Sequence, residues 1–410
     1  MRRSPLILLA VAGLATGQQY IGAGGCASSN CHGGTSALPE SESRILGNEY
    51  SIWSVSDKHS RAYKVLEEPR SKRMAEILSI ADARTDKRCT VCHAAGSPDR
   101  ARSDGVSCEA CHGPSEKWLG PHTQQNSHAA SVAAGMIDTK NLELRAKNCL
   151  ECHLGTRDRV VDHELIAAGH PDLAFELDTF SWAQPMHHRE PKPAAGNTSP
   201  RLRAMAVGQA TAFAEGMRLL AARASRNWPE FAELECYQCH HDLRADSWRI
   251  KRGYAGRKAG SPQVNLARLD VFRLLVAQAA PEEASAVLSA IGQVATAVST
   301  RFGDGAAVAQ AAGAAAQRGD ALVARFARHD FKPETARAMV QALAGDIARI
   351  AGSGPHSAEQ ATMTLDALTS TFAPAAQKAI GPLYDYLEHP STYQPDQFAA
   401  LFRKVAALAN

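Results

Sequence analysis

Residues 105–114 read Gly-Val-Ser-Cys-Glu-Ala-Cys-His-Gly-Pro, and the Cys-x-x-Cys-His pattern at their centre recurs along the chain. Each of the ten cysteines belongs to a pair that a histidine follows directly. Two thiols two residues apart can bond to the two vinyl groups on one porphyrin edge, and the next residue then brings an imidazole to the iron. The sequence therefore predicts five covalently bound groups of haem c (heme c). The predicted attachment cysteines and proximal iron ligands are Cys26, Cys31 and His32; Cys89, Cys92 and His93; Cys108, Cys111 and His112; Cys149, Cys152 and His153; and Cys236, Cys239 and His240.

Two other chemistries use paired cysteines, and the pattern disfavours both. Structural zinc takes two pairs for each site, whereas five pairs do not divide evenly. Zinc also does not require a histidine directly after every second cysteine. A disulfide within Cys-x-x-Cys is typically a reactive redox bond and not a structural cross-link. The repeated histidine, with no cysteine outside the pairs, favours haem.

The first pair departs from the pattern, because four residues separate Cys26 from Cys31. The longer loop has to bulge for both thiols to reach one porphyrin, and glycines around it supply the backbone freedom. These glycines are Gly24, Gly25, Gly33 and Gly34. The alternative is a disulfide between the two cysteines beside an ordinary histidine.

The second axial ligands are sought among the eleven histidines outside the five motifs. His329, His356 and His389 lie in a region without cysteine and are interpreted as surface or packing residues. The other histidines outnumber the five open iron faces, so ligation of most irons by two histidines is feasible. The predicted distal ligands are His59, His122, His163, His170 and His188, with His187 as the alternative to His188 and with His128 and His241 as the remaining candidates.

The first 17 residues, MRRSPLILLAVAGLATG, have the form of a secretory signal peptide, with two arginines, an apolar run and then small residues. The apolar run is shorter than the roughly 18 residues of a membrane helix, and no later stretch reaches that length. We therefore expect residues 1–17 to be removed, and the mature protein to act in the periplasm or outside the cell.

The rest of the chain divides by composition. Residues 18–262 contain all the cysteines, with glycine, proline and polar connections between short helical stretches, and predict a pentahaem cytochrome c domain. Residues 263–410 lack cysteine, are rich in alanine and have helical periodicity, which predicts an α-helical domain. The predicted fold class is all-α, with short helices and loops around stacked haems, followed by a C-terminal helical bundle.

Long helices are expected where apolar residues recur at helical spacing. One is expected over residues 202–226, before the fifth motif. In the C-terminal region, the expected helices cover residues 265–279, 282–300, 305–328, 333–351, 357–373, 374–387 and 395–409.

The formal charge of +3 gives no reason to expect nucleic acid as a partner. Removal of Arg2 and Arg3 with the signal peptide leaves 43 basic against 42 acidic side chains. Two propionates on each of five haems would bring the net charge to about −9 if all of them ionise.

The order of these motifs resembles the cytochrome c-554 family of multihaem electron carriers. The resemblance covers residues 24–155, and its most specific part is the stretch Gly105 to Pro114. It also rests on Trp53 and His59, which follow the first motif, and on the motifs that end at His93 and His153.

The resemblance implies close haem stacking and particular axial ligands. It implies that His122 binds the first iron and His59 the third, and that the second haem can lack a distal ligand. The longer first motif, the fifth motif and the C-terminal helices depart from the family pattern, so its redox partner is not carried over.

These observations favour a periplasmic electron-transfer protein that works between donor and acceptor redox partner proteins. We do not expect it to be an enzyme, although two alternatives stay open. One is a multihaem reductase or oxidase that acts on a small nitrogen or sulfur species at one open haem. The other is a structural subunit of a larger redox complex or filament, assembled through the C-terminal helical domain.

Overall fold

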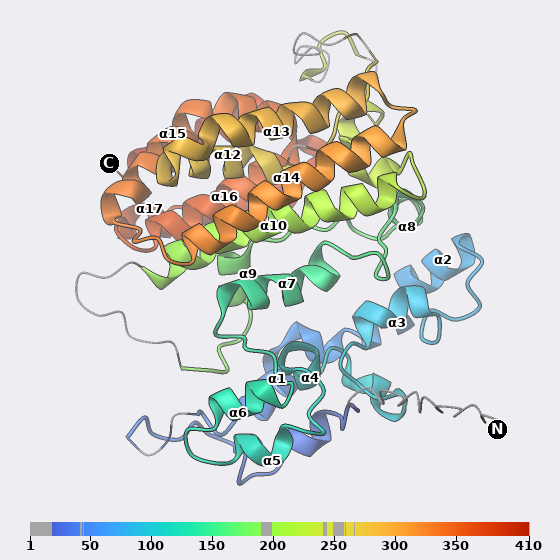
Figure 1. The fold of residues 1–410 in the computed structure, drawn as a ribbon, viewed down its shortest axis with the longest axis vertical. Helices are drawn as coiled ribbons and strands as arrows, with labels where there is room; N and C mark the ends of the chain where they lie inside the picture. The colour runs from blue at the N-terminus through green and yellow to red at the C-terminus, as the bar shows by residue number, and fades with distance from the viewer. Residues whose placement is uncertain are drawn as a thin grey trace, which may run out of the picture.

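A computed structural model describes residues 19–41, 43, 45–189, 199–240, 244–248, 258, 260–265 and 267–409. These residues are mostly helical, and the β-type pairing among them is one isolated antiparallel bridge between Leu234 and Val264. The all-α class predicted from the sequence is confirmed. Figure 1 shows two regions, one of short helices and loops and one of long helices packed as a bundle. The predicted signal peptide, residues 1–17, lies outside the described residues.

The first region consists of short helices, several of which end at a motif histidine. The helices α3, α4 and α7 end at His93, His112 and His153. Gly113 follows α4 with a φ of 80°, a left-handed conformation that glycine adopts at little cost. The helices of this region are η1 Ala23–Cys26, α1 Glu49–Ser56, η2 Lys58–Arg61, η3 Lys64–Glu67, α2 Pro69–Ile77, α3 Lys87–His93, η4 Asp99–Asp104, α4 Cys108–His112, α5 Leu119–His122, α6 His128–Ala133, α7 Leu142–His153, α8 His163–Ala167, α9 Leu177–Ala183, η5 Phe231–Glu233 and η6 Cys236–Gln238.

The short-helix region buries little apolar surface by itself. One of its clusters consists of Leu66, Ala75, Ile80 and Ala83. Many of the other buried apolar residues before residue 160 are alanines. A region with so small a core needs cross-links or a bound group to hold its shape.

The second region is a bundle around one continuous apolar core. Helix α10 packs along α14, α12 packs on α13, and α15 packs on α16 and α19. The rings of Phe213 and Phe272 stack at its centre, with their centroids 4.3 Å apart. The bundle helices are α10 Pro200–Ala224, α12 Ala267–Ala279, α13 Pro281–Thr300, α14 Gly305–Phe326, α15 Pro333–Ser353, α16 Pro355–Thr369, α17 Pro374–Lys378, α18 Gly381–Leu387 and α19 Pro395–Ala407, with the 3-10 turn η7 Pro390–Thr392 before the last.

The long helices lie close to the positions predicted from the sequence. One expected helix, over residues 374–387, is two in the structure, because α18 begins at Gly381 with Pro382 in its first turn. Proline cannot donate the backbone hydrogen bond that would continue α17. The boundary expected near residue 262 stays a prediction, although α10, which precedes it, shares its core with helices that follow it.

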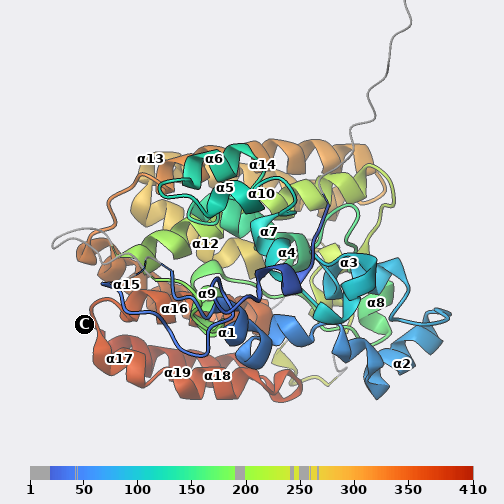
Figure 2. The ribbon, with the colours of Figure 1, turned by 90° about the horizontal axis from the view of Figure 1, so that it is seen from below.

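The two regions meet along α7 and α9. Ala146 and Leu150 of α7 and Leu177 of α9 form a cluster with Ala204 and Leu219 of α10. Figure 2 looks from below and shows the short helices in front of the bundle, with α13 and α14 along one edge and α17 to α19 along the other. The bundle therefore anchors the helix that ends at the fourth motif histidine.

Within the described part of the chain, no helix is both long enough and apolar enough to cross a membrane.

Candidate haem sites

Local helix geometry brings the two thiols of a motif together. In α3, α4 and α7, the cysteines stand at positions i and i+3, so they lie on one helix face, and the histidine follows at i+4. All ten cysteines are free thiols, including Cys26 and Cys31, for which a disulfide was the alternative. Each pair is therefore free to bond to a porphyrin.

The first motif has no regular helix between its cysteines and forms a tight loop instead. The backbone N–H groups of Cys31 and Gly33 both donate to the carbonyl oxygen of Ser28, at 2.9 Å each. A Cβ atom on Gly33 would lie 1.9 Å from the carbonyl oxygen of Ala27, so this position requires glycine. A Cβ atom on Gly24 would meet nothing within 4 Å.

Four of the motif histidines face a second histidine across a short gap. In each pair, the two ring centroids lie between 6.0 and 6.4 Å apart. The pairs are His32 with His122 at 6.2 Å, His93 with His170 at 6.4 Å, His153 with His59 at 6.2 Å and His240 with His163 at 6.0 Å.

These separations fit an iron atom held between the two rings. An imidazole nitrogen binds a metal at about 2 Å, and its ring centre lies about 1 Å further away, so two rings on opposite sides of one iron have centres about 6 Å apart. The residues present therefore fit haem with two axial histidines.

The ring planes divide the four pairs into two kinds. The rings are near-parallel in the pair of His32 and His122, at 16°, and in the pair of His163 and His240, at 28°. They are near-perpendicular in the other two pairs, with angles of 84° and 88°.

Hydrogen bonds at Nδ1 orient five of these rings, and also the ring of His187, for binding through Nε2. A ring whose Nδ1–H donates to an oxygen keeps the lone pair on Nε2, which is the form that binds a metal. The acceptors are Glu49 Oε2 for His32, at 2.9 Å; Asp57 Oδ1 for His59, at 3.0 Å; and backbone carbonyl oxygens of Ala62 for His93, Leu119 for His122, Pro171 for His170 and Pro185 for His187.

His112, the histidine of the third motif, has other histidines around it. Burial, followed by the neighbouring His187 and His32, lowers the pKa of His112 to about 4. His187 is its strongest electrostatic neighbour, ahead of His188, whose ring centroid lies 5.6 Å from that of His187. Burial likewise lowers the pKa of His153 to about 4. Both imidazoles are therefore neutral near pH 7, as metal binding requires.

Two carboxylates, the buried Asp57 and the half-buried Glu49, support histidines of different pairs. Burial raises the pKa of Asp57, but hydrogen bonds from His59 and Gln184 outweigh it and lower that pKa to about 2. Burial also raises the pKa of Glu49, but the hydrogen bond from His32 and those from the backbone N–H groups of Glu49 and Leu46 together outweigh it and lower that pKa. Both groups are therefore ionised at neutral pH.

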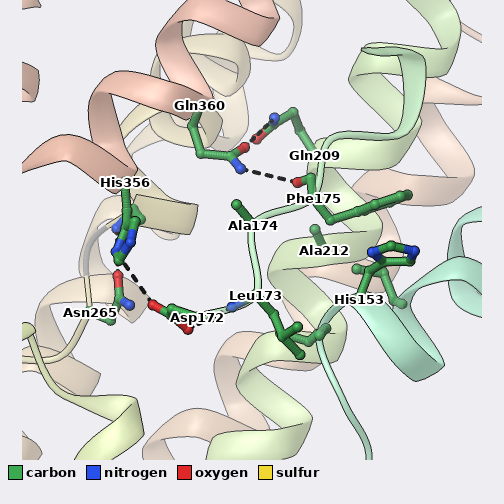
Figure 3. A pocket seen from close by; sticks show the side chains of 13 residues that line it. His153, Asp172, Leu173, Ala174, Phe175, Gln209, Ala212, Asn265, His356 and Gln360 are labelled. Atoms are coloured by element: carbon green, nitrogen blue, oxygen red, sulfur yellow. Dashed lines mark hydrogen bonds and ion pairs between the residues drawn. The ribbon is translucent and has the colours of Figure 1, made fainter. Parts of the chain in front are cut away.

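The bundle also reaches the fourth motif. A cavity of about 30 Å³ lies between α7, α10 and α16, and Figure 3 shows His153 and Phe175 on one side of it and His356 and Gln360 on the other. Gln360 donates to the carbonyl oxygen of Phe175 at 3.1 Å and accepts from Gln209 at 3.2 Å. These contacts hold the segment after α8 against the bundle.

The comparison with known families agrees with this geometry. Residues 26–113 match the family model described as cytochrome c554 and c-prime. This segment is similar to c-type cytochromes. The match includes the first three motifs, in about a fifth of the chain, and it supports covalently bound haem c and a haem-based role in electron transfer. Searches of curated proteins and of solved structures returned no match.

The structure pairs some predicted ligands differently from the pairing that the family resemblance implies. His122 lies opposite His32, as implied, but His59 lies opposite His153 and not opposite His112. His170 lies opposite His93, at the iron face that the resemblance leaves open.

Three other histidines lie away from these pairs. His128 contacts Asp138 at 3.2 Å on the surface, and His329 packs on Phe331. His356 contacts Asp172 at 3.4 Å between the two regions. His241 lies outside the described residues.

Sequence reasoning missed Asp57 and Glu49, although an aspartate two residues before His59 is a pattern that could have indicated a supporting hydrogen bond.

Proposed function

We propose that this chain is a periplasmic electron-transfer protein that holds five haem c groups, each with two axial histidines. The observation that carries the proposal is the opposing imidazole found for four of the five motif histidines at distances that fit one iron. The proposed axial pairs, in motif order, are His32 and His122, His93 and His170, His112 and His187, His153 and His59, and His240 and His163.

The proposed third pair replaces His188 with His187. The Nδ1–H of His187 donates to the carbonyl oxygen of Pro185 at 3.2 Å, which leaves Nε2 for the metal. His187 is also the stronger electrostatic neighbour of His112.

The closed coordination favours a carrier over an enzyme that acts at an open iron. Bound haem supplies a one-electron iron couple, and the protein tunes it through axial ligands and burial. The paired histidines occupy both axial positions, so the chain leaves no face of those irons to a small substrate. The hydrogen bonds at Nδ1 hold the rings in one orientation, which reduces the rearrangement that a change of iron charge requires.

Contacts between motifs indicate which haem attachment sites are neighbours. The thiol of Cys26 neighbours that of Cys108, which supports a first site beside the third. The thiol of Cys92 likewise neighbours that of Cys152, which supports a second site beside the fourth.

Two further contacts join these pairs into one series. The side-chain amide of Asn148, beside Cys149, donates to the carbonyl oxygen of Cys111, which connects the fourth site with the third. Atoms of Asp172 and Cys236 lie within 4.8 Å of each other, and Asp172 is two residues from His170. We therefore propose the order first, third, fourth, second, fifth, with donor and acceptor proteins at the two ends.

Haem counting and spectroscopy of the purified protein test this proposal. Intact mass and the alkaline pyridine assay should give five haems for each chain. Electron paramagnetic resonance (EPR) of the oxidised protein should show low-spin iron only, and carbon monoxide should bind none of the reduced haems. Four haems would mean that Cys26 and Cys31 hold none, and two or more irons that bind carbon monoxide would favour the reductase or oxidase alternative.

A further inference from the structure

Two of the proposed iron ligands donate their second ring nitrogen to a carboxylate. The Nδ1–H of His32 donates to Glu49 at 2.9 Å, and the Nδ1–H of His59 donates to Asp57 at 3.0 Å. His32 belongs to the first pair and His59 to the fourth. These two sites therefore each have a carboxylate hydrogen-bonded to an axial ligand.

The second site has neutral acceptors at both of its ligands. His93 donates to the carbonyl oxygen of Ala62, and His170 donates to that of Pro171, at 2.8 Å each. The three sites thus use the same type of iron ligand, and they differ in the charge of the group that accepts the hydrogen bond from the ligand's Nδ1–H.

At the fourth site, burial strengthens the electrostatic influence of the carboxylate on the histidine that it contacts. The side chain of Asp57 is 4% exposed, and its second oxygen accepts a hydrogen bond from Gln184 at 2.9 Å. The His153 ring, opposite His59, packs against the rings of Phe175 and Phe180, with centroids 5.4 and 5.2 Å away. A charge acts more strongly in such surroundings than in water.

We propose that Glu49 and Asp57 are positioning residues that lower the reduction potentials of the first and fourth haems below that of the second. A carboxylate that accepts the Nδ1–H bond draws the proton towards itself and makes the imidazole a stronger electron donor. Negative charge on the ligand stabilises ferric iron relative to ferrous iron, so one-electron reduction becomes less favourable. This inference rests on the proposed function, because it takes the five axial pairs as given.

The angles between ring planes allow the haems to be told apart. Perpendicular imidazole planes give ferric low-spin haem a highly anisotropic EPR signal, whereas near-parallel planes give a rhombic one. The second and fourth pairs are near-perpendicular and the first pair is near-parallel. A reductive titration followed by EPR should show the highly anisotropic signal of the fourth haem disappearing at a lower potential than that of the second.

Substitution of the carboxylates tests the assignment. Asp57→Asn keeps the shape and an acceptor but removes the charge. It should raise the reduction potential of the fourth haem, read from its highly anisotropic signal, by about 59 mV, which is a tenfold change in the equilibrium constant for one electron. The reduction potential of the second haem should stay unchanged. Glu49→Gln should raise the potential of a rhombic signal in the same way, which provides an independent second variant.

Asp99→Asn is the matched control, because this carboxylate is 91% exposed and pairs with Arg102 at 2.7 Å. Water and salt screen its charge, so its removal should shift no signal appreciably. Unchanged potentials in both carboxylate variants, or equal shifts in the control, would overturn the inference. Failure of the proposed function is distinguishable, since it would show in the unmodified protein as fewer haems or as high-spin iron.

Discussion

Gly33 is a residue whose replacement should remove one haem without touching a cysteine or a ligand. An added Cβ atom would lie 1.9 Å from the carbonyl oxygen of Ala27 and 2.6 Å from its carbon, so the loop between Cys26 and Cys31 would have to open. We expect Gly33→Ala to give four haems for each chain by intact mass. Gly24→Ala, on the other side of the same loop, is the control and should keep five, because its Cβ atom has open space. Five haems in both variants would show that the loop tolerates the change.

His170 owes its position to the way α8 ends. Asp162 caps the helix by accepting a hydrogen bond from the N–H of Leu165 at 2.8 Å, and Gly169 then turns the chain with a φ of 120°. Two histidines seven residues apart therefore face two different motifs, with His163 opposite His240 and His170 opposite His93.

Substitution of His170 by alanine should open the second iron. We expect one carbon monoxide molecule to bind for each reduced protein, together with high-spin iron in the EPR spectrum and loss of one highly anisotropic signal. His128→Ala should change none of these, because His128 contacts Asp138 on the surface. Absence of a new open iron would mean that another ligand holds the second haem.

At the residue scale, the sequence predicts features that depend on residues close together in the chain. The spacing of each Cys-x-x-Cys-His motif places two thiols on one helix turn, and α3, α4 and α7 have this geometry. The pairing of a distal histidine with a motif depends on how distant segments pack. For this reason the position of His59 opposite His153, 94 residues away along the chain, did not follow from any spacing.

At the scale of elements, periodicity was sufficient to place most long helices. Their apolar faces are long, and prolines mark the starts of α13, α15 and α19. The division between α17 and α18 depends on one proline near the middle of an apolar stretch. Apolar periodicity is judged over the whole stretch, so it does not reveal a break at a single residue. The packing of α10 against helices beyond the fifth motif is a tertiary property that its own pattern does not contain.

Two glycines of α14 should respond in opposite directions to the same substitution. A Cβ atom on Gly319 would lie 2.8 Å from Cβ of Ala214 in α10, so Gly319→Ala should lower the free energy of unfolding by about 1–3 kcal/mol through overpacking. Gly313 has open space, so Gly313→Ala should raise it by about 0.5–1 kcal/mol, because alanine loses less conformational entropy in a helix. Thermal unfolding followed by circular dichroism measures both, and a stabilised Gly319→Ala variant would contradict the close contact of α10 and α14.

At the scale of the whole molecule, the bound groups should reverse the charge. The sequence alone has a formal charge of +3 and a pI of about 8.3. In the reduced protein the iron and the porphyrin ring cancel in charge, so removal of Arg2 and Arg3 with the signal peptide and the ten propionates together bring the net charge towards about −9. Isoelectric focusing of the reduced holoprotein should therefore give an acidic value. A basic value would show that the propionates are neutralised or that fewer haems are attached.

The packing of α10 against α14 has a consequence for the timing of synthesis. The fifth motif lies between these two helices in the chain, so it emerges after α10 and well before the partner that covers α10. About 100 residues separate the ends of the two helices, and at about 5–20 residues per second their synthesis takes roughly 5–20 seconds. During that interval the apolar face of α10 has no partner to cover it. We therefore expect the chain to be most prone to aggregation before α14 has followed α10.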